Sequence, residues 1–353
     1  MRVAIVTARP PTGDDVRTRH AAGLTAGLRA AGLQVDHLTA DHAVAPRLWE
    51  SIRVRARTFD VVHVHGIRAL PAVFAASGRS RAVVVSPQAD PGPISVLRRL
   101  LVKPSGRASR ALLEMADRIV CSTASESMRL SQVVPSAHER MRVVPLGVDT
   151  SSIRLAEPLP GDSEVIVALS GPGRTHRIGR SIAALADLGP GYELVVAGPC
   201  AQWRALSISA EQLGVLDRVR FLGPVDDPTM HRWLRTACVV VALSERWTSP
   251  GLVLSALGAG TPVVASEVAQ HLDAARESDG ARVTFVPGDV SPLALADAIN
   301  AAAKVRATPA VAPGLPTIED EIAGLLAVYS ELVELPTGAG LEWGAAAEIR
   351  QAS

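Results

Sequence analysis

The chain has 353 residues, of which 48% are apolar, and its 36 basic and 35 acidic residues give a formal net charge of +1. This length predicts two domains, and the apolar content at near-zero net charge excludes a disordered chain. The balanced charge gives no support to a nucleic-acid partner, which would need a basic surface or a basic domain.

The three cysteines, Cys121, Cys200 and Cys238, are far apart and lie in or beside apolar runs, where we expect buried free thiols. No segment reaches the roughly 18 consecutive apolar residues that a membrane span needs, and the first residues form too short an apolar run for a signal peptide. We therefore expect a cytoplasmic protein with no transmembrane segment, and the sequence leaves peripheral membrane contact open.

Short β-branched runs alternate with Ala- and Leu-rich segments in the first half of the chain, which is the pattern of parallel βαβ units. The runs predict strands at Val3–Thr7, Val35–Thr39, Val61–His65, Ala82–Ser86, Arg118–Cys121 and Arg142–Val144. The segments between them predict helices at Val16–Ala31, Pro46–Arg57, Ala69–Ala76, Pro93–Met115 and Ala124–Val133.

The alternation stops at Leu146–Pro160, which is rich in Pro and Ser and has no periodicity. It then resumes with predicted strands at Val165–Leu169, Glu193–Ala197, Val219–Leu222, Val239–Ala242, Pro262–Ala265 and Val283–Phe285. Helices are predicted at Thr175–Leu188, Ala201–Leu213, Pro228–Thr236, Gly251–Gly258, Pro292–Lys304 and Thr317–Val333.

This pattern predicts two Rossmann-like domains, residues 1–147 and 161–335, joined by a linker at residues 148–160. For the tail at residues 336–353, packing back on the N-terminal domain and mediating an assembly both stay open, as does the oligomeric state. Ligands of open parallel sheets bind beyond the carboxyl ends of the strands. Two such sheets that face each other therefore predict a binding site in the cleft between them.

The start of one predicted helix has the features of an anion site. Ser249 is a favoured N-cap residue, and Pro250 suits the first helical position. The amide groups of Gly251 and Leu252, together with the helix dipole, would favour a diphosphate. An ordinary capped helix explains the same residues.

Basic residues follow a predicted strand of the second domain. Arg174, His176 and Arg177 come after a Gly- and Pro-rich turn, so they project from the carboxyl end of that strand. Fixed cations stabilise a leaving diphosphate, and guanidinium groups bind phosphate well. The alternative is chance, because arginine is abundant throughout this chain.

Two polar segments of the first domain are candidates for binding an acceptor. His63 and His65 lie two residues apart on a predicted strand, so both side chains share one face at its carboxyl end. We expect them to line the cleft and bind a hydroxyl or a sugar, because two histidines alone are weak evidence for a metal. The alternative is a satisfied histidine. Gly13 lets a backbone approach closely, and Asp14 either meets acceptor hydroxyls or caps the next helix.

Several segments together resemble the retaining glycosyltransferases of family 4. ERMRVVPLGVDTSSI resembles that family's linker entry, and ADRIVCSTASESMRL resembles the segment before it. The segments RVRFLGPVDDPTMHRWLRTACVVVALS and PGLVLSALGAGTPVVAS resemble its donor-site core, and FDVVHVHG resembles its third strand. The resemblance covers roughly residues 1–305.

The resemblance implies a GT-B fold, an α/β architecture in which two Rossmann-like domains face each other across a cleft. It also implies a hexosyltransferase that needs no metal or cofactor and moves a sugar, with retention, from a nucleotide-diphospho-sugar to an acceptor hydroxyl of unknown type. In this scheme Glu245 and His65 are catalytic, Trp247 and Ser255 join the donor site, and Gln88 joins the acceptor site. A small residue that packs inside its helix is the alternative for Ser255, and the residue itself favours it.

Departures from the family pattern keep a second hypothesis open. The family's two glutamates, eight residues apart, are replaced by Trp247 and Ser255, and the His-Gly that usually follows Ser-Pro reads Gln88-Ala89. The alternative is a catalytically degenerate GT-B protein that binds a ligand or partner without turnover. A nucleotide-sugar epimerase on the same fold is a third hypothesis, which has no signal beyond the architecture.

Overall fold

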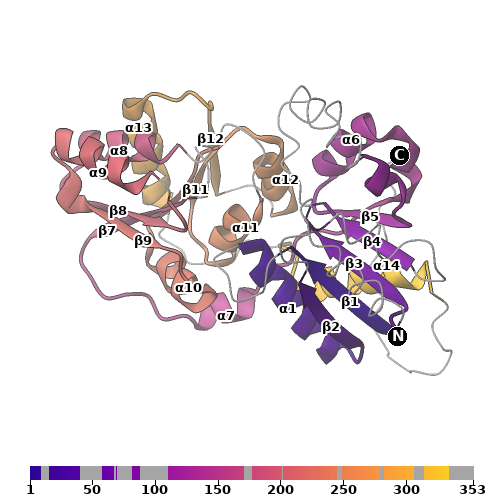
Figure 1. Cartoon of the computed structure of the whole chain (residues 1–353). Coiled ribbons are helices and arrows are strands. Elements are labelled where there is room, and N and C mark those ends of the chain that lie inside the picture. Colours follow the sequence, from indigo (N-terminus) through magenta and orange to yellow (C-terminus); the bar gives the residue numbers. More distant parts are fainter. Residues whose placement is uncertain are drawn as a thin grey trace.

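A computed structural model describes residues 1–8, 16–39, 58–66, 69, 82–87, 110–170, 177–200, 202–244, 249–278, 282–305 and 314–333. In this part of the chain, two parallel sheets of six strands each lie side by side, and helices flank both (Figure 1). The predicted α/β class with two Rossmann-like sheets is therefore confirmed. No helix in the described ranges is long and apolar enough to cross a lipid bilayer.

The N-terminal sheet has the strand order β2-β1-β3-β4-β5-β6. Its strands are β1 (Arg2–Thr7), β2 (Gln34–Thr39), β3 (Val61–His65), β4 (Ala82–Ser86), β5 (Arg118–Cys121) and β6 (Met141–Val143). Every residue of β3 and β4 is buried, as expected for central strands of a parallel sheet that is covered on both faces. Helices α1 (Val16–Ala30) and α14 (Ile318–Ser330) contribute to the core on one face, and α6 (Ala124–Val133) to the core on the other.

The C-terminal sheet has the strand order β12-β11-β10-β7-β8-β9. Its strands are β7 (Glu164–Leu169), β8 (Tyr192–Ala197), β9 (Val219–Gly223), β10 (Val239–Ala242), β11 (Val263–Ser266) and β12 (Val283–Val286). The core on one face includes residues of α8 (Ile178–Asp187), α9 (Trp203–Gln212) and α13 (Pro292–Lys304). The core on the other face includes residues of α10 (Asp227–Thr236) and α11 (Gly251–Gly258). We call each sheet with its helices a lobe.

The strand order reverses once in each sheet. In the C-terminal sheet this point lies between β7 and β10, and in the N-terminal sheet it lies between β1 and β3. Loops that leave two such neighbouring strands diverge to opposite faces, and a crevice opens between them at the carboxyl edge. Candidate binding residues are therefore those at the carboxyl ends of these four strands and in the segments that succeed them.

The sequence placed the strands within one residue at each end, but it missed parts of the helical structure. The predicted linker contains the short helix α7 (Thr150–Leu155), which Asp149 caps by accepting the Ser152 N–H at 2.9 Å. Helix α12 (Ala269–Glu277) was not predicted, and α8 begins at Ile178 rather than at residue 175. The helix predicted at 46–57 lies outside the described residues, as do residues 70–76 of the helix predicted at 69–76. Of the helix predicted at 93–115, residues 93–109 lie outside the described residues and residues 110–114 are helical.

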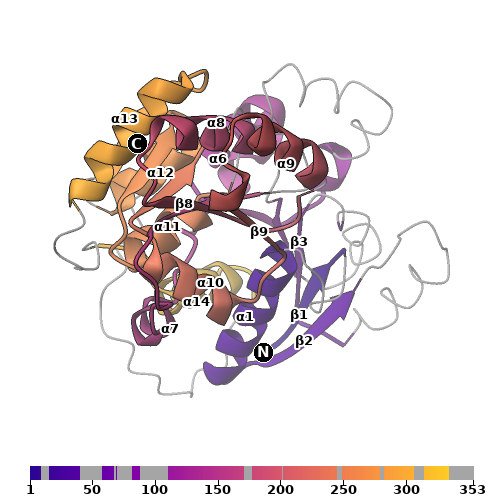
Figure 2. The ribbon, with the colours of Figure 1, turned by 90° about the vertical axis from the view of Figure 1, so that its left-hand side faces the viewer.

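The last described helix belongs to a different lobe from the one we expected. We assigned residues 317–333 to the C-terminal domain, but α14 packs on the N-terminal sheet (Figures 1 and 2). Its buried residues Ile322, Leu325, Val328 and Tyr329 share a core with Val3 and the other inward residues of β1. The chain therefore crosses between the lobes twice. The tail at 336–353 lies outside the described residues.

Candidate active site

Three polar residues lie in a row at the carboxyl edge of the N-terminal sheet. In the strand register Thr7 of β1 pairs with His65 of β3, and His65 pairs with Ser86 of β4. The row therefore spans the point at which the strand order reverses. Because ligands of parallel sheets bind at this edge, these residues form the floor of a candidate site.

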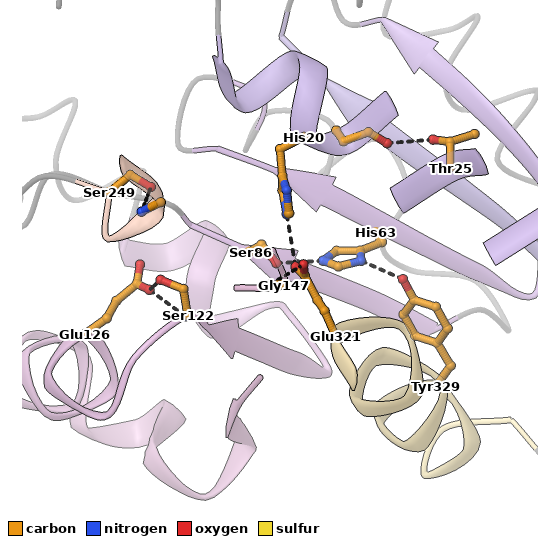
Figure 3. Close-up of polar contacts among 12 residues, drawn as sticks. His20, Thr25, His63, Ser86, Ser122, Glu126, Gly147, Ser249, Glu321 and Tyr329 are labelled. Atoms are coloured by element: carbon orange, nitrogen blue, oxygen red, sulfur yellow. Dashed lines mark hydrogen bonds and ion pairs between the residues drawn. The ribbon is translucent and has the colours of Figure 1, made fainter. Parts of the chain in front are cut away.

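His63 is a satisfied core residue. Its Nδ1 lies 2.6 Å from the Tyr329 hydroxyl on α14, and its Nε2 lies 2.8 Å from Ser86 Oγ (Figure 3). The side chain is fully buried, and burial lowers the pKa of His63 to about 3, so the ring is neutral. Our prediction that His63 binds an acceptor was wrong, because both of its ring nitrogens are already engaged inside the core.

His65 lies only two residues away, but its hydrogen bonding differs from that of His63. It is 5% exposed, and neither of its ring nitrogens has a hydrogen-bond partner in the described structure. Its ring lies 4.1 Å from that of His63, centroid to centroid. Burial, and then the nearby histidines, hold the pKa of His65 well below its ordinary value, so this ring is neutral as well. Buried polar atoms are rarely left unpaired in proteins, and each such atom costs about 1–3 kcal/mol.

The C-terminal lobe presents the start of α11 beyond the carboxyl end of β10. Pro250 is the N-cap residue, one position later than predicted, and the Ser249 hydroxyl accepts the Gly251 N–H at 3.2 Å. Amides in the first turn of a helix have no carbonyl partner within it and point out of its N-terminus. Ser255, one turn further along, is half-buried.

The α11 start lies at the junction of the lobes. A Cβ atom placed on Gly251 would come within 3.1 Å of Leu146 Cδ2, which lies in the segment that joins the lobes and packs against the C-terminal core. A side chain at position 251 would therefore require Leu146 to shift by a few tenths of an ångström.

Arg177 begins α8, the helix that follows β7. It is the N-cap residue and has φ 39°, the left-handed conformation that non-glycine residues seldom adopt. Strained backbone of this kind costs on the order of 1–3 kcal/mol and is concentrated at functional sites. Arg177 and the α11 start thus follow β7 and β10, the two strands that flank the reversal of strand order.

Seven of the predicted site residues lie outside the described residues: Gly13, Asp14, Gln88, Arg174, His176, Glu245 and Trp247. Of the described site residues, the structure places His65 at the carboxyl edge of the N-terminal sheet, Gly251 beside Leu146 of the segment that joins the lobes, and Arg177 at the start of α8. In the described ranges, no group of three or more His, Cys, Asp or Glu side chains is arranged to hold a metal ion.

Helix α12 contributes polar residues that the sequence analysis did not select. Gln270 is 1% exposed, and its side-chain Nε2 has no hydrogen-bond partner in the described structure. Asp273 accepts the Ser125 N–H at 3.1 Å and so caps α6 of the other lobe. Burial, and then the Asp273 charge, raise the pKa of Glu277 to about 7. These three polar residues recur at helical spacing, which was the sequence signal that could have predicted the helix. No capping signal accompanies it, because Val268 provides no side-chain cap at the helix start.

Family models match both lobes. Residues 2–152 match Glycosyltransferase Family 4, and residues 176–304 match Glycosyl transferases group 1. D-inositol 3-phosphate glycosyltransferase 1 of Catenulispora acidiphila is 32% identical over 179 residues, which cover 45% of this chain and 43% of that protein. The homologous enzyme of Xylanimonas cellulosilytica is 30% identical over 230 residues, which cover 56% and 52%. The chain thus spans about half the length of the curated relatives it matches.

Solved structures show the same architecture. Anabaena HepE in complex with UDP-glucose aligns with a TM-score of 0.71 at 19% identity, covering 93% of this chain and 99% of that one. Sucrose-phosphate synthase from Thermosynechococcus elongatus aligns with a TM-score of 0.66 at 20% identity, covering 93% and 94%. At these identities the likeness establishes the fold.

Proposed function

Because the chain belongs to the glycosyltransferases of group 1 and family 4, we propose that it moves a sugar from a nucleotide-diphospho-sugar to an acceptor hydroxyl with retention. One observation carries this proposal. The start of α11, with its outward amides, lies at the junction of the lobes, and the polar edge of the N-terminal sheet contains the unpaired His65. An anion-binding element and a hydroxyl-binding element thus belong to opposite lobes.

The donor diphosphate binds at the reversal of strand order in the C-terminal sheet. The Leu252 amide and the helix dipole attract the phosphate oxygens, and the Ser249 hydroxyl, which accepts the Gly251 N–H, donates its own hydrogen to them. Arg177, held in a strained conformation at the α8 start, supplies a guanidinium group together with Arg174, and His176 lies between them in sequence. Ser255 and Trp247 contact the nucleoside or the sugar.

The chemistry needs stabilisation of a leaving anion. The bond between the anomeric carbon and the phosphate oxygen breaks, and its electron pair leaves with the diphosphate. The acceptor hydroxyl then attacks the oxocarbenium-like sugar on the same face and gives its proton to the departing phosphate oxygen. Arg177 and the α11 amides are held at the starts of their helices before the charge develops, which is how electrostatic catalysis lowers the barrier.

The acceptor binds at the edge of the N-terminal sheet. The neutral His65 ring has one donor and one acceptor nitrogen, so it can bind a hydroxyl group in either sense. Gly13, Asp14 and Gln88 follow β1 and β4 in sequence and complete this half of the site. His63 supports the His65 ring from the core side without touching the substrate.

Glu245 is the remaining carboxylate candidate in the donor loop. The usual glutamate pair is replaced by Trp247 and Ser255 in this chain. A serine makes one or two hydrogen bonds to a ribose where a carboxylate would accept two from its hydroxyls. We therefore propose that Glu245 binds hydroxyl groups of the sugar or of the ribose. The degenerate, binding-only protein remains the second candidate function because of this replacement.

Two measurements test the proposal. Thermal shift with UDP-, GDP- and ADP-sugars reports donor binding, since a ligand of the native state raises the melting temperature by mass action. Release of nucleotide is then followed with a panel of hydroxylated acceptors, which includes inositol phosphates because of the curated relatives. We expect stabilisation by one nucleotide class and transfer to one acceptor. No response to any nucleotide, together with no hydrolysis of any donor, contradicts the transferase and supports the degenerate protein, as does stabilisation without hydrolysis or transfer.

A further inference from the structure

Both segments that join the lobes pass from one core to the other within a few residues. Val144 is buried in the core of the N-terminal lobe, and Val148 is buried in that of the C-terminal lobe. In the return segment Leu315 belongs to the C-terminal core, and Ile322 belongs to the N-terminal core. The change of lobe is therefore confined to a short stretch of each segment.

The two crossing segments are bound to each other. The Val148 N–H donates to the Pro316 carbonyl at 2.9 Å, and Val148 forms a parallel bridge with Thr317. At Gly147 the backbones touch, because a Cβ atom there would lie 2.5 Å from the Thr317 carbonyl oxygen. A side chain at position 147 would separate the two segments.

A buried carboxylate holds this crossing to the N-terminal lobe. Glu321 of α14 is 6% exposed, and its Oε2 accepts the Gly147 N–H at 2.8 Å. Its Oε1 lies 3.0 Å from His20 Nε2 on α1 (Figure 3). One side chain thus connects α1, the backbone of the first crossing and the helix that follows the second crossing.

Titratable and polar groups from several elements surround Glu321. Burial lowers the pKa of His20, but Glu321 and then Asp227 raise it above the ordinary value. Asp227 of the C-terminal lobe also pairs with Arg19 at 3.2 Å, beside His20 on α1. On the other side of the carboxylate lie the neutral His63 and the Tyr329 hydroxyl, whose pKa is raised by burial and by Glu321. The Glu321 carboxylate is thus held in place by two hydrogen bonds, one from the Gly147 N–H and one from the His20 side chain.

We propose that Glu321 is a positioning residue for glycosyl transfer. Because it fixes Gly147 to the N-terminal lobe, it restricts the movement of one lobe relative to the other to rotations about the backbone bonds that adjoin Gly147 in the two crossing segments. This inference rests on the proposed function, in which the lobes supply different halves of the site. Its consequence is that Glu321 determines how accurately His65 meets the sugar bound at the α11 start. Donor binding does not depend on it, because the donor contacts belong to the C-terminal lobe.

The test compares Glu321→Gln with Glu319→Gln, an exposed glutamate on the same helix. Spin labels are attached at Met128→Cys on α6 and Leu293→Cys on α13, which are 63% and 61% exposed, in a Cys200→Ser background. Pulsed EPR then gives the distance distribution between the lobes. Glutamine preserves the volume and one acceptor oxygen, so the variant is expected to fold.

We expect a broader distance distribution for Glu321→Gln than for the wild type and for Glu319→Gln. We also expect kcat to fall by about tenfold or more, as misplaced reacting groups produce, while the nucleotide Kd stays unchanged. A distance distribution identical to the wild type overturns the proposal, and so does a loss of nucleotide affinity in step with kcat. The distance measurement needs no turnover, so it tests whether Glu321 restricts lobe movement even if no sugar transfer is found.

Discussion

The carboxyl edges of the two sheets present different polar groups at equivalent positions, where the strand order reverses. Where the strand order of the N-terminal sheet reverses, the edge presents the neutral ring of His65 beside Thr7. At the corresponding point of the C-terminal sheet, the following segments present a helix N-terminus and Arg177. A neutral donor and acceptor suits hydroxyl groups, whereas amides and guanidinium groups suit phosphate. Similar architecture thus leaves the choice of ligand to the residues that follow the strands.

A second contrast lies within one strand. His63 and His65 occupy the same face of β3, but among the described residues His63 has polar partners, Tyr329 and Ser86, and His65 has none. In our proposal the first histidine stabilises the fold, and the second binds the acceptor. Substitutions test both differences, the one between the two sheets and the one between the two histidines. The expected effects range from loss of nucleotide binding to a small change in the pH dependence of stability.

The largest effect is expected from removing the cations of the donor half. Arg174→Ala combined with Arg177→Ala should weaken nucleotide binding on the order of 100-fold or more, because hydrogen bonds to charged groups contribute about 1.5–3 kcal/mol each. Titration calorimetry measures the affinity, and circular dichroism checks that the fold is intact. Arg154→Ala, an exposed arginine of α7, is the matched control. Unchanged nucleotide affinity in the double variant refutes the assignment of the phosphate site.

His63→Leu should destabilise the protein by about 2–4 kcal/mol, because the buried Tyr329 and Ser86 hydroxyls lose their partners. Urea denaturation of the wild type and the variant measures the free energy of unfolding. A loss below about 0.5 kcal/mol, typical of neutral surface positions, would show that the His63 hydrogen bonds do not stabilise the N-terminal lobe.

His65→Leu should have the opposite profile. The free energy of unfolding should stay constant or rise by about 1 kcal/mol, because an unpaired buried ring is replaced by an apolar side chain. The value of kcat/KM for the acceptor should fall about 10- to 100-fold, since a hydrogen bond to the substrate is lost. Steady-state kinetics at saturating donor separates the two effects. A variant that keeps full acceptor kinetics would remove His65 from the site.

The smallest effect is expected from a substitution on α12, the helix whose Asp273 caps α6 of the other lobe. The pKa of Glu277 is raised from 4.5 to about 7, so the folded protein binds more protons than the unfolded chain between these values. Stability should therefore fall as the pH rises through this interval. Glu277→Gln should remove this part of the pH dependence, with a higher melting temperature at pH 8 by on the order of 2 °C. Equal pH profiles for the variant and the wild type would contradict the shifted pKa.

The sequence determined most of the framework. The β-branched runs predicted the strands to within one residue, because central strands of parallel sheets are buried on both faces and read as continuous apolar runs. The segment that opens α11 was also predictable, since Ser249, Pro250 and Gly251 carry local signals for a helix start. In both cases the information lies in neighbouring residues.

The states of the site residues were decided by the tertiary structure. Nothing local distinguishes His63 from His65. The difference arises from Tyr329, 266 residues away, on a helix that returns to the first lobe. Likewise, Glu321 reads as an ordinary helix residue until α14 brings it to His20 and Gly147. Local sequence fixes the backbone conformation, but burial and hydrogen-bond partners depend on which distant segments pack together.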